Sequence, residues 1–316
     1  MKTRLFTIFL LITIIFPLAA GGTKEAARSN EVVVYANDSF CSDWGAGPEI
    51  CRLFEEATGY KVTLVSVGSA AQVLSKAILE KNKPQSDVLL GIDNMLYPRA
   101  VQADVFTDWT PYDWSTFAVM WDSESSVPAP KSLADLTDPV YRKKIILEDP
   151  RMSTVGLGFL AWTIAVFGDG YTEYWRALKP NILTMAPSWD TGYGLFTAGE
   201  APLTVSYTTS AAYHVCYDNT DRYKALEFDG GYVEQTEGAA LTKGALNEAG
   251  GRAFLEFLAG ETAQAVIPET QWMYPSNSAV VLPESYKAAP VPAQIMEIDP
   301  TILDAAAETV LTILAE

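Results

Sequence analysis

The chain has 316 residues, of which 49% are hydrophobic, and its formal net charge is −17. This amount of apolar sequence supports a packed core in one large or two medium domains, which excludes a wholly disordered protein. The negative charge disfavours nucleic acid and anionic membranes as partners, because both repel an acidic surface.

The first 30 residues are typical of an export signal followed by a leader. Lys2 and Arg4 precede an uncharged, mostly apolar run that ends in small residues at position 20. This pattern predicts a signal peptide over residues 1–20, with an uncleaved anchor as the alternative, and a flexible leader over residues 21–30. A bacterial lipoprotein carries a cysteine at the cleavage point, where this chain has glycine. We therefore expect a periplasmic or exported protein without a lipid tether.

Strand, loop and helix patterns then alternate. Strands are expected over residues 32–35, 62–67, 87–92, 117–121 and 203–206. Helices are expected from Pro48 to just before Gly59, through residues 73–78, over residues 155–167 and through residues 253–258. This alternation predicts an α/β fold with a mostly parallel sheet, divided into two lobes with a cleft between them. Ligands bind such sheets at the carboxyl ends of strands, where this chain carries Asn37, Ser39, Ser69 and Asp93.

The three cysteines are Cys41, Cys51 and Cys216. An odd number cannot form a complete disulfide framework, although one Cys41–Cys51 bridge is feasible in an oxidising compartment. The sequence contains no Cys-x-x-Cys motif and no Cys/His cluster, so a zinc site is not expected.

The segment V-S-Y-T-T-S-A-A-Y-H, residues 205–214, leaves three kinds of site open. These are a catalytic site on His214, an iron site on Tyr207 and Tyr213, and a pocket for another ligand. A lone histidine beside a strand end is more often a structural hydrogen-bonding residue than a general base. The chain also lacks the G-x-S-x-G and P-loop motifs of common enzyme classes.

Aromatic residues in loop-like sequence indicate a binding pocket. Trp189 lies in P-S-W-D-T-G-Y and Trp272 in E-T-Q-W-M-Y-P. Aromatic faces with a nearby carboxylate suit a flat cationic heterocycle, although ordinary packing remains an alternative for each ring. Ser153 and Thr154 precede an apolar helix, where hydroxyls and free amides either cap the helix or bind phosphate.

Several segments together resemble the thiamine-binding periplasmic proteins, which are the substrate-binding components of bacterial thiamine ABC importers. The resemblance covers about residues 32–281 and is carried by N-D-S-F-C-S-D-W-G-A-G-P, S-D-V-L-L-G-I-D-N, E-D-P-R-M-S-T-V-G-L-G-F-L, Y-G-L-F-T-A-G-E-A-P-L-T-V-S-Y-T-T-S-A-A-Y-H and W-M-Y-P. It implies a two-lobed type II periplasmic binding protein fold, in which each lobe is a mixed, mostly parallel sheet flanked by helices. We expect residues 31–117 and 231–272 in lobe 1, and residues 118–230 and 273–316 in lobe 2.

The resemblance also implies a function without catalysis. The cleft would close around thiamine, thiamine monophosphate or thiamine diphosphate, and a monomer would deliver the ligand to an ABC permease and its ATPase. No cofactor and no metal are expected, since thiamine is the transported ligand. The resemblance implies ligand contacts at the positions of this chain that match those of the family, namely Trp189, Tyr207, Tyr213 and Trp272. Ser153 and Thr154 match the region that contacts the phosphate.

Two positions depart from the family pattern. The family loop typically begins Y-D-S-F, whereas this chain has N-D-S-F with Asn37, and the family has an aspartate where this chain has Ser69. That aspartate is a plausible counter-charge for the thiazolium ring. Either Asp93 compensates for its loss, or the ligand is another organic cation or a thiamine precursor. Ferric iron and a thiamine-cleaving enzyme with Cys41 as nucleophile are the further alternatives.

Overall fold

A computed structural model describes residues 30–316 of the protein. The expected signal peptide, and the expected leader except for its last residue, lie outside these residues. Within residues 30–316, no helix has the length and apolar character needed to cross a membrane.

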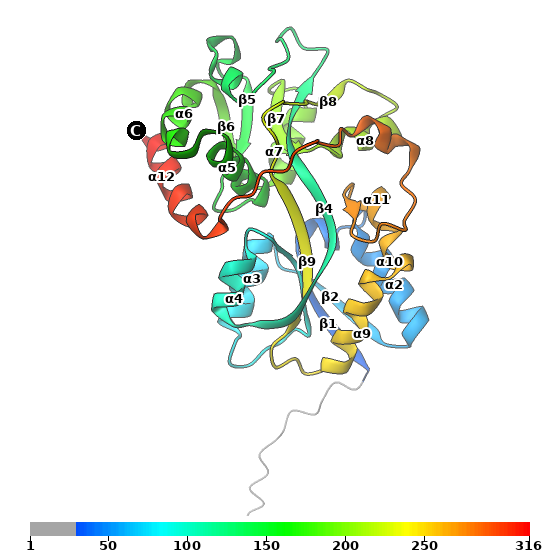
Figure 1. Ribbon diagram of the computed structural model, residues 1–316. Coiled ribbons are helices and arrows are strands. Elements are labelled where there is room, and N and C mark those ends of the chain that lie inside the picture. The colour runs from blue at the N-terminus through cyan, green and yellow to red at the C-terminus, as the bar shows by residue number, and fades with distance from the viewer. Residues whose placement is uncertain (1–29) are drawn as a thin grey trace, which may run out of the picture.

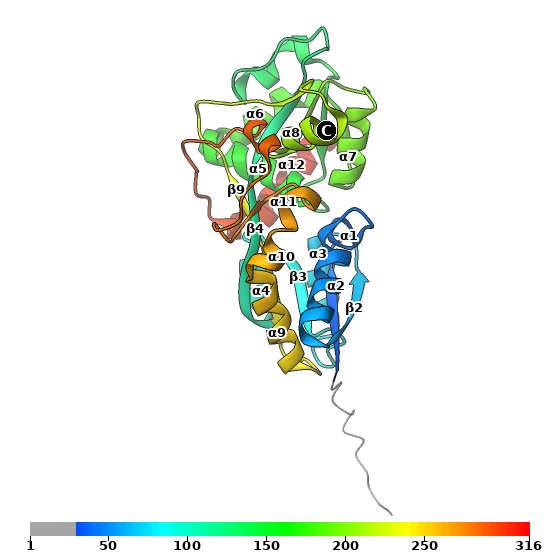
Figure 2. The ribbon, with the colours of Figure 1, turned by 90° about the vertical axis from the view of Figure 1, so that its right-hand side faces the viewer.

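The described chain forms two lobes that are connected by two neighbouring strands, β4 (Phe106–Asp122) and β9 (Glu234–Thr242) (Figure 1). The side view shows the same two parts, with the C-terminus in the upper lobe (Figure 2). The strand order is β2-β1-β3-β9-β4-β7-β5-β6, and β8 and β10 also pair with β4. The other strands are β1 (Glu31–Ala36), β2 (Lys61–Ser66), β3 (Val88–Asp93), β5 (Ile145–Glu148), β6 (Ile182–Ala186), β7 (Leu203–Tyr207), β8 (Tyr223–Ala225) and β10 (Tyr274–Pro275).

Each lobe contains three parallel strands. In the lower lobe β1 pairs in parallel with β2 and β3, and in the upper lobe β5 pairs in parallel with β6 and β7. The two connecting strands add antiparallel pairs, because β9 runs opposite to β3 and β4, and β4 runs opposite to β7. The α/β class and the two-lobed fold are confirmed, and the sheet is mixed.

The expected strand 117–121 is only the end of β4, which is 17 residues long. Its first part was missed because the sequence F-T-D-W-T-P-Y-D mixes a proline and two aspartates with aromatic residues, and therefore resembles a loop. Its pairing with β9 is also irregular, with register shifts between Thr107 and Thr110 and between Pro111 and Asp113. A bulged strand of this kind bends locally, which suits a connection between lobes.

Helices cover both faces of the lower sheet, with α3 and α4 on one side and α2 and α9 on the other (Figure 1). The helices are α1 (Asp38–Cys41), α2 (Ala46–Thr58), α3 (Ala70–Leu79), α4 (Tyr97–Ala103), α5 (Thr154–Phe167), α6 (Tyr171–Leu178), α7 (Trp189–Thr197), α8 (Ser210–Tyr213), α9 (Glu248–Ala259), α10 (Glu261–Gln264), α11 (Ile267–Thr270) and α12 (Leu303–Ala315). The expected end of α2 is confirmed, since Gly59 follows the helix with φ of 78°, a left-handed conformation that glycine adopts at little cost.

Each lobe has its own hydrophobic core. Phe40, Phe54 and Phe254 are fully buried in the lower lobe. In the upper lobe the apolar helix α5 contributes the fully buried Trp162, and α12 packs against α5 and α6. Buried aromatic side chains stabilise both cores. Because each lobe has a core of its own, the lobes can move as two rigid bodies on either side of β4 and β9.

Candidate functional site

A cavity of about 940 Å³ is lined by residues from both lobes. This volume lies in the range of small-molecule binding sites. Nine of the ten residues that the sequence analysis selected line it, namely Asn37, Ser39, Ser69, Ser153, Thr154, Trp189, Tyr207, Tyr213 and Trp272. The fold therefore brings these nine residues, which are up to 235 positions apart in the sequence, to one cleft.

Aromatic rings form two groups on the cleft walls. Tyr213 and Trp272 meet edge to face, with ring centroids 5.6 Å apart, and Tyr213 is 37% exposed. Trp189 stacks on Tyr193 at 5.2 Å, and its indole N–H donates to Ser206 Oγ at 2.8 Å. Rings that are held by packing and hydrogen bonds present fixed faces to a ligand, which limits the entropy lost on binding.

Trp272 has an unusual backbone conformation, with φ of 54°. A bulky residue pays a steric cost in this left-handed region, and such residues cluster at functional sites. Trp272 directly follows Gln271, the C-terminal cap of α11, and its ring stacks over Tyr286 at 6.1 Å. The backbone turn aims the indole at the cleft instead of continuing the helix.

The polar residues at the strand ends cap helices. Asn37 Oδ1 accepts hydrogen bonds from the Phe40 amide at 2.9 Å and from Ser39 Oγ at 3.2 Å. Ser69 forms a capping box with Gln72 at the start of α3. These residues therefore shape the lower side of the cleft, and their side chains already have partners in the protein.

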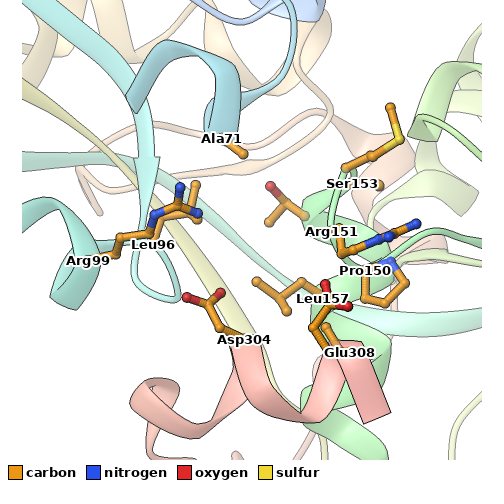
Figure 3. Close-up of a pocket in the computed structure, with 12 residues that line it drawn as sticks. Ala71, Leu96, Arg99, Pro150, Arg151, Ser153, Leu157, Asp304 and Glu308 are labelled. Atoms are coloured by element: carbon orange, nitrogen blue, oxygen red, sulfur yellow. The ribbon is translucent and has the colours of Figure 1, made fainter. Parts of the chain in front are cut away.

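Ser153 caps α5 and lies next to a smaller cavity of about 470 Å³, which shares Ser153 and Thr154 with the main cleft. The Ser153 hydroxyl accepts from the Gly156 amide at 3.4 Å. Arg99 extends from α4 on one side of this smaller cavity, and Arg151 lies on the other side, above α12 (Figure 3). Asp304 and Glu308 also line this cavity, and Arg151 pairs with Asp149 at 2.8 Å. The helix N-terminus and the guanidinium groups suit an anion, with Arg99 as the arginine that faces the cavity from the lower lobe.

Asp93 is the selected residue that does not line the cleft. It is fully buried, and its Oδ1 accepts hydrogen bonds from the amides of Met95 and Leu96 at 2.9 and 2.8 Å. Burial raises the pKa of Asp93 to about 6. The carboxyl group thus organises the turn after β3, and its side chain also interacts with Thr154 of the cleft lining. Its expected role as a counter-charge for the ligand stays a prediction.

The structural role expected for His214 is supported by its surroundings. The imidazole is buried, with Nε2 2.8 Å from Tyr193 Oη and Nδ1 2.6 Å from Asp218 Oδ2. Burial lowers the pKa of His214, and the nearby Asp218 carboxylate only partly opposes this shift. Both ring nitrogens are occupied within the protein, so the imidazole is not available to a ligand.

The iron and enzyme alternatives lack a supporting geometry. Over residues 30–316, no three His, Cys, Asp or Glu side chains are grouped so that they could hold a metal ion. The Tyr207 hydroxyl donates to Gln235 Oε1 at 2.8 Å. Cys41 and Cys51 are both free thiols, not the feasible disulfide, and burial raises their pKa values to about 11 and about 12. An activated nucleophile needs the opposite shift.

The sequence analysis missed several cleft residues. They include Trp44, Tyr217, Gln235 and Glu237. Gln235 and Glu237 alternate along β9 and are both buried, so their side chains share one face of that strand. The spacing of two in E-Q-T-E places both side chains on one face of an expected strand, but only the structure shows that this face is buried in the cleft.

Comparisons with known proteins agree with this geometry. Residues 45–270 match the family described as bacterial extracellular solute-binding protein. A thiamine-binding periplasmic protein of Brucella abortus biovar 1 is 37% identical over 313 residues, covering 92% of this chain and 93% of that protein. The thiamine-binding periplasmic protein of Escherichia coli K12 is 33% identical, covering 90% and 92%.

A solved structure, described as a periplasmic thiamin binding protein, superposes with a TM-score of 0.85 at 31% identity, covering 91% of this chain and 97% of that one. These matches extend over most of this chain and most of each relative. The chain therefore belongs to the bacterial extracellular solute-binding protein family and, within it, to the thiamine-binding periplasmic proteins.

Proposed function

We propose that this protein captures thiamine or a thiamine phosphate in the cleft between its lobes and delivers it to an ABC importer. The observation that carries the proposal is the single cavity lined from both lobes by Trp189, Tyr207, Tyr213 and Trp272. Aromatic faces attract a cationic heterocycle through the ring quadrupole and bury its apolar surface. The relatives that match over most of the chain are named for thiamine binding.

Binding would change the shape of the protein without breaking any bond in the ligand. The ligand first contacts one lobe, and rotation about β4 and β9 brings the other wall against it. The α5 N-terminus, with Ser153 and Thr154, lies at the end of the cleft where a phosphate group would be placed. The permease would then recognise the closed form.

The remaining features of the proposal concern the cellular setting. The signal-like start of the chain supports export to the periplasm as a soluble monomer, and the partners would be a membrane permease and its ATPase. We propose that lobe 1 contains residues 31–117 and 231–272 and that lobe 2 contains residues 118–230 and 273–316. Cys41 lies outside the cleft lining and has a raised pKa, which favours a binding protein over a thiamine-cleaving enzyme.

Calorimetric titration of the purified protein tests the proposal. Thiamine, thiamine monophosphate and thiamine diphosphate are titrated separately, with the free pyrimidine precursor as a fourth ligand. We expect 1:1 binding of at least one thiamine form at micromolar concentration or below. Binding of the precursor alone would favour the second candidate, in which the ligand is a thiamine precursor or another organic cation. The reason for this candidate is Ser69, which is uncharged where the family has an aspartate. No binding of any of the four would rule out the proposed function.

A further inference from the structure

Two buried carboxyl groups face each other on the strands that connect the lobes. Asp113 of β4 is the direct cross-strand partner of Glu237 on β9, and these side chains are 0% and 8% exposed. Glu237 Oε2 accepts from the Tyr112 hydroxyl at 2.7 Å, and Oε1 accepts from Gln235 Nε2 at 2.9 Å. Apart from its interaction with the Glu237 carboxyl group, Asp113 has no hydrogen-bond partner for its carboxyl oxygens among the described residues.

The groups that face Glu237 carry no positive charge. They are Asp93 on β3, Tyr112 and Asp113 on β4, and Tyr207 on β7, and none of them is basic. Burial raises the pKa of Asp113 well above its ordinary value and that of Glu237 to about 7. Two neighbouring carboxyl groups in a dry site cannot both ionise without a compensating cation. When no cation is present, both groups are therefore protonated below a pH of about 7, and above it Asp113 keeps its proton while Glu237 ionises.

Glu237 is also the buried acid of the cleft lining. The other acidic residues that line the cavity are Asp38, Asp190 and Glu269, and all three are exposed to solvent. Charges on exposed groups are screened by water and salt, whereas a buried carboxylate interacts strongly with a nearby charge. The cleft therefore has one acid whose charge state a bound cation would change.

We propose that Glu237 supplies the negative charge that selects a cationic ring in this cleft, and that at mildly acidic pH binding of the cation expels the proton carried by Glu237, while its neighbour Asp113 stays protonated. This inference rests on the proposed function, since it assigns the counter-charge for the thiazolium ring of that same ligand. The protonated carboxyl group of Glu237 becomes a carboxylate, the proton passes to solvent, and the carboxylate pairs with the ring. Glu237 thereby takes the role that an aspartate at position 69 would have had.

A pH dependence follows from this exchange. Above a pH of about 7 Glu237 is already ionised and affinity for the cation is independent of pH. Below that pH a proton must leave for each cation that binds, so the dissociation constant rises by about tenfold for each unit of pH. A ligand with the same shape and a neutral ring gains nothing from the carboxylate and shows no such dependence.

The experiment measures proton release and affinity together. Thiamine and a neutral isostere, in which a carbon atom replaces the charged ring nitrogen, are titrated by calorimetry at pH 6.5 in buffers of different ionisation enthalpy. We expect the wild type to release a substantial fraction of one proton per thiamine bound and none with the isostere. In Glu237→Gln, proton release disappears, thiamine affinity falls at least about tenfold, and affinity for the isostere stays within about threefold.

Glu200→Gln is the matched control, because it makes the same chemical change at an exposed position outside the cleft lining. It is expected to release protons and bind thiamine as the wild type does. If Glu237→Gln binds thiamine as tightly as the wild type, with the same proton release, the inference is overturned while the proposed function stands. If the wild type binds neither thiamine nor its phosphates nor the isostere, both are overturned.

Tyr112→Phe provides a second variant in case Glu237→Gln fails to fold. The Tyr112 hydroxyl donates to Glu237 and lowers the pKa of that carboxyl group, so its removal raises the pKa. We expect the pH at which thiamine affinity begins to fall to move upward, with unchanged affinity on the high-pH plateau. A pH profile that matches the wild type would contradict the proposal.

Discussion

Two groups of residues that line the cleft differ in the charge they present. One, which we call the cationic end, comprises the rings of Tyr213 and Trp272 and the buried acid Glu237. The other, which we call the anionic end, is the smaller cavity beside Ser153, where Arg99 and Arg151 lie on opposite sides and Asp304 and Glu308 extend from α12 (Figure 3). Aromatic faces and a carboxylate suit a cation, whereas guanidinium groups beside a helix N-terminus suit an anion.

Under the proposed function, this difference favours a molecule with opposite charges at its two ends. A thiamine phosphate has a cationic ring system at one end and a phosphate at the other. The acidic surface of the protein as a whole contributes little to this distinction, because exposed charges are screened over about 8–10 Å at physiological salt. The selectivity must come from groups that line the cleft.

Replacing Trp272 by alanine should have the largest effect, because it removes a wall of the cationic end. We expect the dissociation constants for thiamine and both phosphates to rise by about 30- to 100-fold, in line with the loss of a central aromatic contact worth about 2–3 kcal/mol. Calorimetry checks this. The control Trp272→Phe keeps an aromatic face and should lose much less, and equal losses in the two variants would show that the ring is not a ligand contact.

A double substitution of Arg99 and Arg151 by glutamine tests the anionic end. Affinity for the thiamine phosphates should fall by about 5- to 10-fold at low salt, and less at high salt, because the lost interactions are electrostatic and partly exposed. Unphosphorylated thiamine should bind as it does to the wild type. Competitive titration measures these affinities. A similar loss for all ligands would show that the two arginines do not interact specifically with the phosphate group.

Glu148 is another buried carboxyl group, and its ionisation should affect the stability of the protein. Its two carboxyl oxygens have no hydrogen-bond partner among the described residues, and burial raises its pKa well above the ordinary value. An acid whose pKa is raised by folding does not destabilise the folded state below its unfolded-state pKa, which is about 4.3 for glutamate. As the pH rises from that value to the folded-state pKa, the folded state loses stability relative to the unfolded state. The advantage of Glu148→Gln over the wild type should therefore grow from pH 5 to pH 8, reaching about 1–2 kcal/mol. Thermal unfolding across this pH range measures it, and a constant difference would contradict the assignment.

Cys41→Ala should have almost no effect on binding. The thiol is free, does not line the cleft and has a raised pKa, so it contributes neither a ligand contact nor a nucleophile. The dissociation constant for thiamine should change by less than about twofold. Incubation of the wild type with thiamine and a nucleophilic amine should release no free thiazole, and any release that the variant lacks would support an enzyme instead.

The sequence predicted the regular parts of this fold well. The strand and helix patterns around β1, α2, β3 and α5 are clear because each has a continuous apolar face or run. The start of β4 was not predicted, since its polar residues and Pro111 hide a strand that pairs irregularly with β9. The alternation of strands and helices predicted the parallel pairs within each lobe, but not the antiparallel pairs that β4 and β9 form, because these depend on contacts between distant segments.

The candidate site likewise contains residues that the sequence predicted and residues that it did not. Trp189 and Trp272 were recognisable because tryptophan in polar, turn-like sequence is hard to explain by packing. The partners of Asp93 were not predicted, because the sequence shows where a strand ends but not which backbone amides its carboxylate contacts. Glu237 was missed because its importance arises from its neighbour across the sheet, Asp113, which is 124 positions away in the chain.

A crystal structure of the protein with thiamine monophosphate tests the central claim most directly. We predict that the thiazolium and pyrimidine rings lie against Tyr213 and Trp272, and that the phosphate reaches Ser153 and Thr154 at the start of α5. A ligand bound in the reverse orientation, with its phosphate beside Glu237, or bound outside this cleft, would contradict the account.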